Sequence, residues 1–312
     1  MYIPAIAASP ALMNSMPVYQ PEVLSDEELR SLLRQYRREN WQGIQTAEWQ
    51  ERIVESIVRD DGEAVLERVG AFWNIPSGAL VLDIGSGVGS FVLGCRRRGL
   101  LAFGIEPDRI GRGGALTSVQ IARRRIEEQA FAVAVGEKLP FADCSFDLIV
   151  MNQVMEHVAD QAALLRESLR VLKPGGAVYI ACPNYLRFYE PHYKIFWFPL
   201  LPKLLGRAYL RFRGRNPVLL GQLTYTTNGR IRRLLSKCGS GYSFLDLNRE
   251  EFLEKFNQNS FVSWRARLVA RAMRLPMIGQ SMSRAATKFI SLTEGGSEML
   301  VLRETNPKGV RS

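Results

Sequence analysis

Short apolar runs alternate with helical stretches from Ala79 onward, and this rhythm constrains the fold more than any other feature of the chain. Runs of this length, rich in Val, Ile and Leu and bounded by turn residues, predict β-strands. Continuous apolar strands are typical of a parallel sheet that is covered on both faces. We therefore expect an α/β fold with a doubly wound, Rossmann-like sheet of seven mostly parallel strands. The expected strands are 79–84, 102–105, 130–135, 146–151, 177–181, 242–247 and 298–302.

The rest of the chain is arranged around this sheet as N-terminal helices and as helical basic insertions that cap it. A glycine-rich turn and its flanking strands define a ligand-binding core at 78–184, which is preceded by a flexible arm at 1–24 and a helical region at 25–77. The remaining segments are a basic aromatic insertion at 185–228, a return to the sheet at 229–248, a helical basic insertion at 249–291, and a last strand and tail at 292–312.

The helical region before the sheet has recognisable start signals. Ser25 and Glu28 have the spacing of a capping box, and Leu29, Leu32 and Leu33 follow at helical spacing. A second helix is expected from about Thr46, with Trp49, Ile53, Ile57 and Val58 on one face. That face either packs against the core or forms a lid over a ligand.

Charge is distributed unevenly along the chain. Lys and Arg number 41 and Asp and Glu number 31, so the net charge is +10. Residues 1–184 hold 19 basic and 23 acidic side chains (net −4), whereas residues 185–312 hold 22 and 8 (net +14). Ten basic residues and no acidic residue lie between Glu190 and Asp246. The second half of the chain is therefore expected to face a negatively charged partner.

Cysteine and histidine usage excludes two kinds of small-domain scaffold. The four cysteines are far apart in sequence, and with only two histidines a zinc cluster cannot be assembled from local spacing, so we expect no metal site and no disulfide framework.

The chain lacks the usual signals for membrane spanning or secretion. No stretch of 18 uncharged apolar residues occurs, and the first 20 residues lack Lys and Arg and are interrupted by Pro. We expect a cytoplasmic protein.

The segment VLDIGSGVGSF, residues 81–91, reads as a strand that runs into a glycine turn and then a helix. Gly85, Gly87 and Gly89 would let the backbone turn sharply and approach a ligand, and the helix would offer free amides. The spacing departs from the dinucleotide fingerprint G-x-G-x-x-G, and Asp83 places a carboxylate at the strand end. That carboxylate would repel a pyrophosphate but could receive a ligand ammonium.

A second carboxylate follows the next strand, in the segment GIEPD at 104–108. An acidic side chain at the end of this strand is placed to accept hydrogen bonds from both hydroxyls of a ribose. The carboxylate of Glu106 would repel a ligand whose ribose carries a 2′-phosphate.

These residues resemble the class I S-adenosylmethionine-dependent methyltransferases. The resemblance continues through GEKLPF (136–141), SFD (145–147), MEHV (155–158) and LKPGG (172–176), and it covers about residues 78–184. It is strongest to the branch that includes ubiquinone and menaquinone biosynthesis enzymes. PN at 183–184 and EPHYK at 190–194 are weakly similar to bacterial methyltransferases of surface-polysaccharide and lipid pathways.

The resemblance implies S-adenosyl-L-methionine as the cofactor and assigns residues to its parts. The methionine part would be lined by Asp83, Gly85, Gly87 and Gly89, and the ribose would be held by Glu106, beside Pro107. Glu137 would lie near the adenine, and Asn152 and Gln153 would lie beside the sulfonium. Many relatives have an acidic residue and Ala before the Leu-Pro-Phe run, where this chain has Val135-Gly136. The LKPGG segment is expected to be a structural turn.

Both histidines of the chain fall just after expected strand ends, on the ligand edge of the sheet. If the methyl acceptor is a hydroxyl, a base near neutral pKa would help, and His192 and His157 are the candidate catalytic residues. The His157 element is shared by enzymes of differing chemistry and could only shape the pocket. His192 belongs to the insertion, where it could instead bind the acceptor or support the structure.

A basic amphipathic helix is expected after Pro202. Lys203, Arg207 and Arg211 are four residues apart, whereas Leu201, Leu204, Leu205, Ala208 and Phe212 take the other face, after the aromatic run at 196–198. This pattern is typical of a segment in a membrane interface, although a cap helix packed on the sheet would also produce it. The stretch from Trp264 to Leu275 repeats the pattern.

Three hypotheses for function follow. The first is a methyltransferase whose acceptor is a small molecule, glycan, lipid-linked sugar or lipid, phosphorylated or not, at the anionic inner face of a membrane. The second is an RNA methyltransferase, favoured by the net charge of +14 but opposed by the aromatic and aliphatic residues mixed among the basic ones and by the lack of an RNA-binding module. The third is a non-catalytic cofactor-binding scaffold. The sequence does not determine the oligomeric state.

Overall fold

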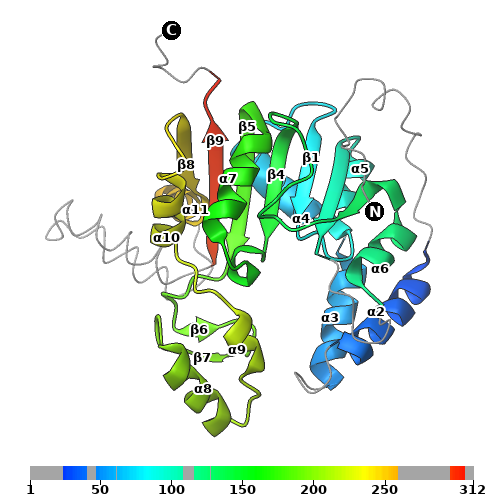
Figure 1. Ribbon diagram of the computed structural model, residues 1–312, viewed down its shortest axis with the longest axis vertical. Helices are drawn as coiled ribbons and strands as arrows, with labels where there is room; N and C mark the ends of the chain where they lie inside the picture. Colours follow the sequence, from blue (N-terminus) through cyan, green and yellow to red (C-terminus); the bar gives the residue numbers. More distant parts are fainter. Residues whose placement is uncertain are drawn as a thin grey trace, which may run out of the picture.

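The computed structural model describes residues 24–40, 47–60, 62–107, 116–126, 128–258 and 296–305. Its centre is a seven-stranded sheet in the order β3-β2-β1-β4-β5-β9-β8 (Figure 1). The strands are β1 (Leu80–Ile84), β2 (Leu101–Glu106), β3 (Phe131–Val133), β4 (Phe146–Asn152), β5 (Leu172–Cys182), β8 (Tyr242–Asp246) and β9 (Ser297–Arg303). β9 alone runs in the opposite direction to the other six of these strands, so the expected α/β fold is confirmed.

Helices cover both faces of the sheet, as its apolar strands require. All five residues of β1 are buried, and successive side chains point to opposite faces: Val81 packs with one core cluster, and Leu82 and Ile84 with the other. One face is covered by α4 (Glu63–Gly70), α5 (Ser90–Arg97), α6 (Ser118–Arg125) and α11 (Leu247–Gln258). The other is covered by α7 (Gln161–Val171) and α10 (Asn228–Leu235).

Two helices precede the sheet, α2 (Asp26–Asn40) and α3 (Ala47–Arg59). The predicted capping box is present, because the backbone N–H of Ser25 donates to Glu28 Oε2 at 2.8 Å and the N–H of Glu28 donates back to Ser25 Oγ at 3.4 Å. Leu29 and Leu33 of α2 and Val54 of α3 pack with residues of the α6 region, including Ile121. The described side chains therefore support the core-packing alternative for this region.

The LKPGG segment differs from our expectation. We predicted a turn between helix and strand, but residues 172–176 are already part of β5, which pairs with β4 from Phe146 onward. The register shifts between Phe146 and Leu148, which marks an irregularity of the β-bulge kind. Gly175 has a φ of 80°, a conformation that glycine adopts without strain, so the strand absorbs the bend instead of ending at it.

The insertion after β5 builds a small core of its own. It contains a hairpin of β6 (Tyr189–Glu190) and β7 (Ile195–Phe196), followed by α8 (Lys203–Phe212) and α9 (Val218–Gln222). Its buried cluster consists of Tyr193, Ile195, Trp197, Leu210 and Leu220. Because this cluster is separate from the two clusters of the sheet, the insertion packs largely on itself.

The insertion and the N-terminal helices lie beyond the same edge of the sheet. Figure 1 shows the β6–β7 hairpin, α8 and α9 on one side and α2 and α3 on the other, both past the carboxyl ends of the parallel strands. The chain enters the insertion directly after β5 at this edge, and α11 likewise begins directly after β8. Residues 1–23 of the expected arm at 1–24 and the basic stretch Trp264–Leu275 lie outside the described residues.

Candidate active site

The glycine turn between β1 and α5 uses three left-handed backbone conformations. Gly85, Gly87 and Gly89 have φ values of 74°, 53° and 83°. The N–H groups of Gly85 and Ser86 both donate to the carbonyl of Ile105, at 2.8 and 3.0 Å, which fixes the turn against β2. These φ values explain why glycine is needed at all three positions.

The three glycines differ in what surrounds them. A Cβ on Gly85 would lie 2.5 Å from Val154 Cγ2, and a Cβ on Gly89 would lie 2.7 Å from Phe131 Cζ, so these two glycines permit close packing. A Cβ on Gly87 would meet no atom within 4 Å among the residues that the structure describes. Gly87 is therefore the member of the turn that faces open space, where a ligand could approach the backbone.

Asp83 lies on β1, just before the glycine turn, and is 5% exposed. Within the described part of the chain, no donor hydrogen-bonds its carboxylate. Burial, followed by the nearby charges of Glu106 and Asp60, raises the pKa of Asp83 well above its usual value. A ligand ammonium would compensate this buried carboxylate, so the residue fits the amino group of a bound amino acid.

Glu106, the last residue of β2, turns its carboxylate toward the same place. Its Oε2 accepts a hydrogen bond from the N–H of Gly87 at 3.0 Å, and the side chain is half-buried. Oxygen acceptors at this position can receive the hydroxyls of a ribose. Pro107, which follows, is exposed.

The other predicted cofactor residues are brought to this edge by neighbouring strands. Glu137 follows β3, and the adjacent Gly136 lies against Ile84 at the end of β1, where a Cβ would come within 3.1 Å of Ile84 Cγ2. Asn152 ends β4, and Gln153 after it has a φ of 59° while its N–H donates to Ala181 O at 2.7 Å. Asn152 and Gln153 are exposed.

The two predicted catalytic histidines come together in space although they are 35 residues apart. His157 ends the 3-10 turn η2 (Met155–His157) after β4, and His192 lies in the turn of the β6–β7 hairpin. Their ring centroids are 5.6 Å apart, with an interplanar angle of 85°. Nδ1 of His192 lies 2.8 Å from Oε1 of the fully buried Glu190. The other oxygen of Glu190 accepts the N–H of Tyr193 at 2.7 Å.

Glu156 completes this cluster and was not among our predicted site residues. Its side chain is fully buried, and neither carboxylate oxygen has a hydrogen-bond partner among the described residues. Nε2 of His157 lies 3.9 Å from Glu156 Oε1. Burial raises the pKa of Glu156 to about 7. Its place beside His157 in the sequence gave no signal, since burial without a partner arises only in the folded chain.

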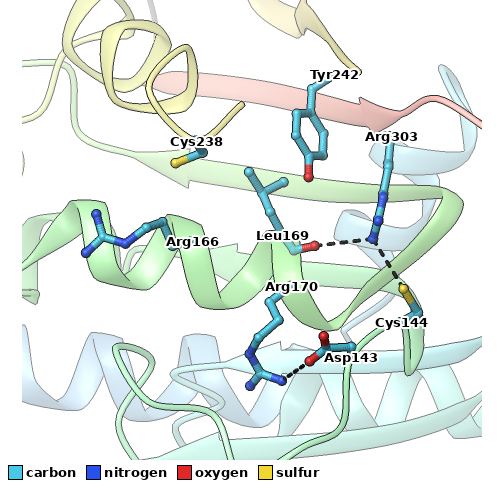
Figure 2. Close-up of a pocket in the computed structure, with 8 residues that line it drawn as sticks. All are labelled: Asp143, Cys144, Arg166, Leu169, Arg170, Cys238, Tyr242 and Arg303. Atoms are coloured by element: carbon cyan, nitrogen blue, oxygen red, sulfur yellow. Dashed lines mark hydrogen bonds and ion pairs between the residues drawn. The ribbon is translucent and has the colours of Figure 1, made fainter. Parts of the chain in front are cut away.

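A pocket of about 250 Å³ opens at the opposite edge of the sheet (Figure 2). Two of its arginines are already engaged: Arg170 pairs with Glu167 and Asp143, and Arg303 donates to the backbone carbonyls of Leu169 and Leu172. Since Asp143 precedes β4 and Arg303 ends the antiparallel β9, this pocket is remote from the glycine turn. The lining residues are Asp143, Cys144, Arg166, Leu169, Arg170, Cys238, Tyr242 and Arg303.

Comparison with known proteins identifies the central part of the chain. Residues 82–180 match the methyltransferase domain family. An uncharacterized methyltransferase from Mycobacterium sp. (strain KMS) is 37% identical over 118 residues, which are 38% of this chain and 44% of the relative. Methyltransferase GfsG from Streptomyces halstedii is 32% identical over 127 residues, 38% of this chain and 43% of GfsG. The chain therefore matches less than half the length of these relatives.

A solved structure can be aligned with much of this chain. Phosphoethanolamine N-methyltransferase 2 from Haemonchus contortus, in complex with S-adenosyl-L-methionine, aligns over 78% of this chain and 53% of its own, with 17% identity and a TM-score of 0.46. The family match and the relatives support a methyltransferase domain in residues 82–180, with S-adenosylmethionine as its cofactor. Asp83 and Gly87, described above, fit that cofactor.

Proposed function

We propose that this chain, which carries a class I methyltransferase domain, is an active enzyme that methylates a glycan, lipid-linked sugar or lipid at an anionic membrane surface. The attacking group is a hydroxyl or another nucleophile of that acceptor. The observation that carries the proposal is the meeting of Asp83, Gly87 and Glu106 at one sheet edge, beside a cluster that holds both histidines of the chain.

The cofactor residues have distinct roles in this proposal. Asp83 receives the ammonium of the methionine part, Gly87 leaves room for the ligand, and Glu106 accepts the ribose hydroxyls. Glu137 lies by the adenine, and Asn152 with Gln153 borders the sulfonium. When bound, S-adenosylmethionine supplies an activated methyl group, so the protein mainly has to align and desolvate the acceptor.

The acceptor side is formed by the insertion and η2. His192, held by Glu190, is the candidate group that prepares the acceptor nucleophile, with His157 against it. The hairpin that carries His192 continues into α8, so the site and the proposed membrane surface belong to one structural unit.

The outer surface of α8 supports the membrane location. The residues of α8 that pack inward are Gly206 and Leu210, whereas Leu204 is 78% and Phe212 is 87% exposed. The apolar residues of α8 expected on one face and the basic Arg207 and Arg211 expected on the other are all turned toward solvent. The reason is Gly206, whose missing side chain lets the helix contact Trp197. No described helix is long and apolar enough to cross a membrane.

The aromatic residues of the β6–β7 region extend this surface. Phe188, Phe196 and Phe198 are each about half exposed. The ring of Phe196 contacts the rings of both other residues. Exposed apolar side chains beside basic ones are typical of an interfacial anchor and are not needed for contact with an RNA backbone. For this reason we favour a lipid surface over RNA, and we propose an acceptor of the polyprenyl-lipid or surface-polysaccharide type.

The cofactor half of the proposal is tested by calorimetry with S-adenosylhomocysteine. Gly87→Val should abolish binding, because its side chain would occupy the open space beside the turn. Gly78→Val is the matched control: Gly78 also has a positive φ, 66°, and open surroundings, but it lies before β1 at the opposite edge. Equal affinity in the wild type and Gly87→Val would refute the placement. Binding without turnover on any acceptor class would favour a non-catalytic scaffold.

A further inference from the structure

We propose that Glu156, His157 and His192 form a binding site for one divalent transition-metal ion of the zinc class. Each residue offers one ligand atom, and the three atoms lie within 4.8 Å of one another. Two imidazoles and a carboxylate are a donor set that suits such ions. The site goes beyond the proposed function, and metal binding can be measured whether or not the chain transfers a methyl group.

The spacing of the donors requires only small side-chain adjustments. Zinc lies about 2.0 to 2.2 Å from nitrogen and oxygen ligands, so tetrahedral donor atoms are about 3.3 to 3.6 Å apart. Glu156 Oε1 and His157 Nε2 are already 3.9 Å apart. With 40% of its side chain exposed, His157 offers a path by which an ion could enter.

Glu156 supplies the observation that points most directly to a ligand. It is fully buried beside two imidazoles, with neither oxygen hydrogen-bonded in the described structure. An ionised carboxylate without a partner in such surroundings is strongly destabilising, whereas coordination to a cation would satisfy it. Glu156 is therefore suited to be a metal ligand, and the metal cation would be supplied from solution.

Glu190 provides the outer support that metal-binding histidines usually have. Nδ1 of His192 lies 2.8 Å from Glu190 Oε1, so the proposal makes Nε2 the ring atom that would bind the metal. Glu190 is itself held by the Tyr193 N–H at 2.7 Å and the Tyr185 hydroxyl at 3.3 Å. A carboxylate that fixes the imidazole orientation in this way is the common second layer of zinc sites.

Three protein ligands leave a tetrahedral ion with one open position. If the proposed function is correct, that position would bind the oxygen of the acceptor, since the cluster lies at the acceptor side of the domain. The imidazole donors favour zinc-class ions over Mg²⁺ and Ca²⁺, which prefer oxygen ligands.

The test is Zn²⁺ titration of the full chain, prepared without a histidine tag and stripped of metal, in competition with a chromophoric chelator. We expect one Zn²⁺ per chain and no comparable binding of Mg²⁺. His157→Ala, His192→Ala and Glu156→Gln should each weaken Zn²⁺ binding by more than tenfold. Glu190→Gln should weaken it by about 10- to 100-fold, the usual effect of losing an outer-layer partner.

Glu304→Gln is the control variant, because Glu304 is exposed and follows β9 at the opposite edge of the sheet. Circular dichroism and S-adenosylhomocysteine affinity, measured on every variant, separate metal loss from misfolding and from failure of the cofactor site. Glu156→Gln removes a buried carboxylate that has no hydrogen-bond partner among the described residues, so we expect it to stay folded. The proposal is overturned if the folded wild type binds no Zn²⁺ at micromolar concentrations, or if the three ligand variants bind it as the wild type does.

Discussion

Asp83 combines burial with a function that needs its charge, and the two requirements conflict. A carboxyl whose pKa is raised by folding binds its proton more tightly in the folded chain than in the unfolded chain. Its stabilising contribution is therefore complete below the unfolded pKa of about 3.9 and is lost as the pH rises toward the folded pKa. At neutral pH the cofactor-free protein thus holds this carboxylate at a cost.

We predict that Asp83→Asn raises the free energy of unfolding of the cofactor-free protein by about 1 to 3 kcal/mol near pH 8, the range for relieving a buried group without a partner. The gain should shrink toward pH 5. Denaturant unfolding at both pH values measures it, and calorimetry should show weaker S-adenosylhomocysteine binding. Asp143→Asn, at an exposed position, is the control. A variant that is less stable than the wild type at both pH values would contradict this account.

Residues that are consecutive at a strand end could be assigned from sequence, whereas tertiary clusters could not. Asp83 and Glu106 lie near the ends of β1 and β2, and the glycines follow β1, so strand prediction alone placed them at one edge. The contact between His157 and His192 depends on how the hairpin folds back over η2. The lack of a hydrogen-bond partner for the buried Glu156 carboxylate depends on the residues that surround it in the folded chain. Residue spacing in the sequence does not predict this.

At the scale of elements, α8 is positioned by a glycine inside a helix. A Cβ on Gly206 would lie 2.8 Å from Trp197 Cη2 and 2.9 Å from Leu220 Cδ2. Ala in a helix is ordinarily more stable than Gly by about 0.5 to 1 kcal/mol. The close contact should reverse this sign, because overpacking a core costs about 1 to 3 kcal/mol.

We therefore expect Gly206→Ala to lower the free energy of unfolding and Gly229→Ala to raise it slightly. Gly229 is also helical, in α10, but a Cβ there would meet no atom within 4 Å in the described structure. Denaturant unfolding of both variants gives the comparison. Equal stabilisation by the two substitutions would mean that α8 does not depend on close contact with Trp197.

The basic side of α8 carries a second prediction at this scale. Replacing Lys203, Arg207 and Arg211 by Glu should abolish flotation with anionic vesicles at low salt, since each basic residue near an anionic surface contributes about 1 kcal/mol. The control changes Arg166, Arg233 and Lys237 to Glu, an equal change of charge at exposed positions on or beside α7 and α10. Flotation that is reduced equally by both triples would indicate attraction by net charge alone.

The strands of the sheet were predictable from sequence, but the packing of the insertion was not. The seven strands follow from apolar runs between turn residues, and the βαβ rhythm fixes the parallel arrangement. The insertion lacks such repetition. Its helix α8 packs inward at Gly206, where a glycine and a tryptophan fit together, and hydrophobic periodicity does not reveal this pairing.

At the scale of the whole molecule, the sheet and the insertion have separate buried clusters. Elements with little shared core can open without unfolding the rest of the chain. The cofactor site belongs to the sheet, through β1, β2 and the glycine turn. Ligand binding should therefore stabilise the sheet without an equal effect on α8.

Hydrogen exchange measures this difference. S-adenosylhomocysteine at about 100 times its Kd stabilises the folded state by about 2.7 kcal/mol, so amides of β1 and β4 that exchange only through global unfolding should slow by about 100-fold. Amides of α8 should exchange through opening of the insertion alone and change little. Because Gly87→Val should not bind the ligand, the ligand should not slow exchange in β1 or β4 of this variant. In the variant with Lys203, Arg207 and Arg211 replaced by Glu, the ligand should still slow exchange in β1. If α8 slows as much as β1, the insertion and the sheet unfold as one unit, and the cofactor would then be coupled to the proposed membrane surface through global stability.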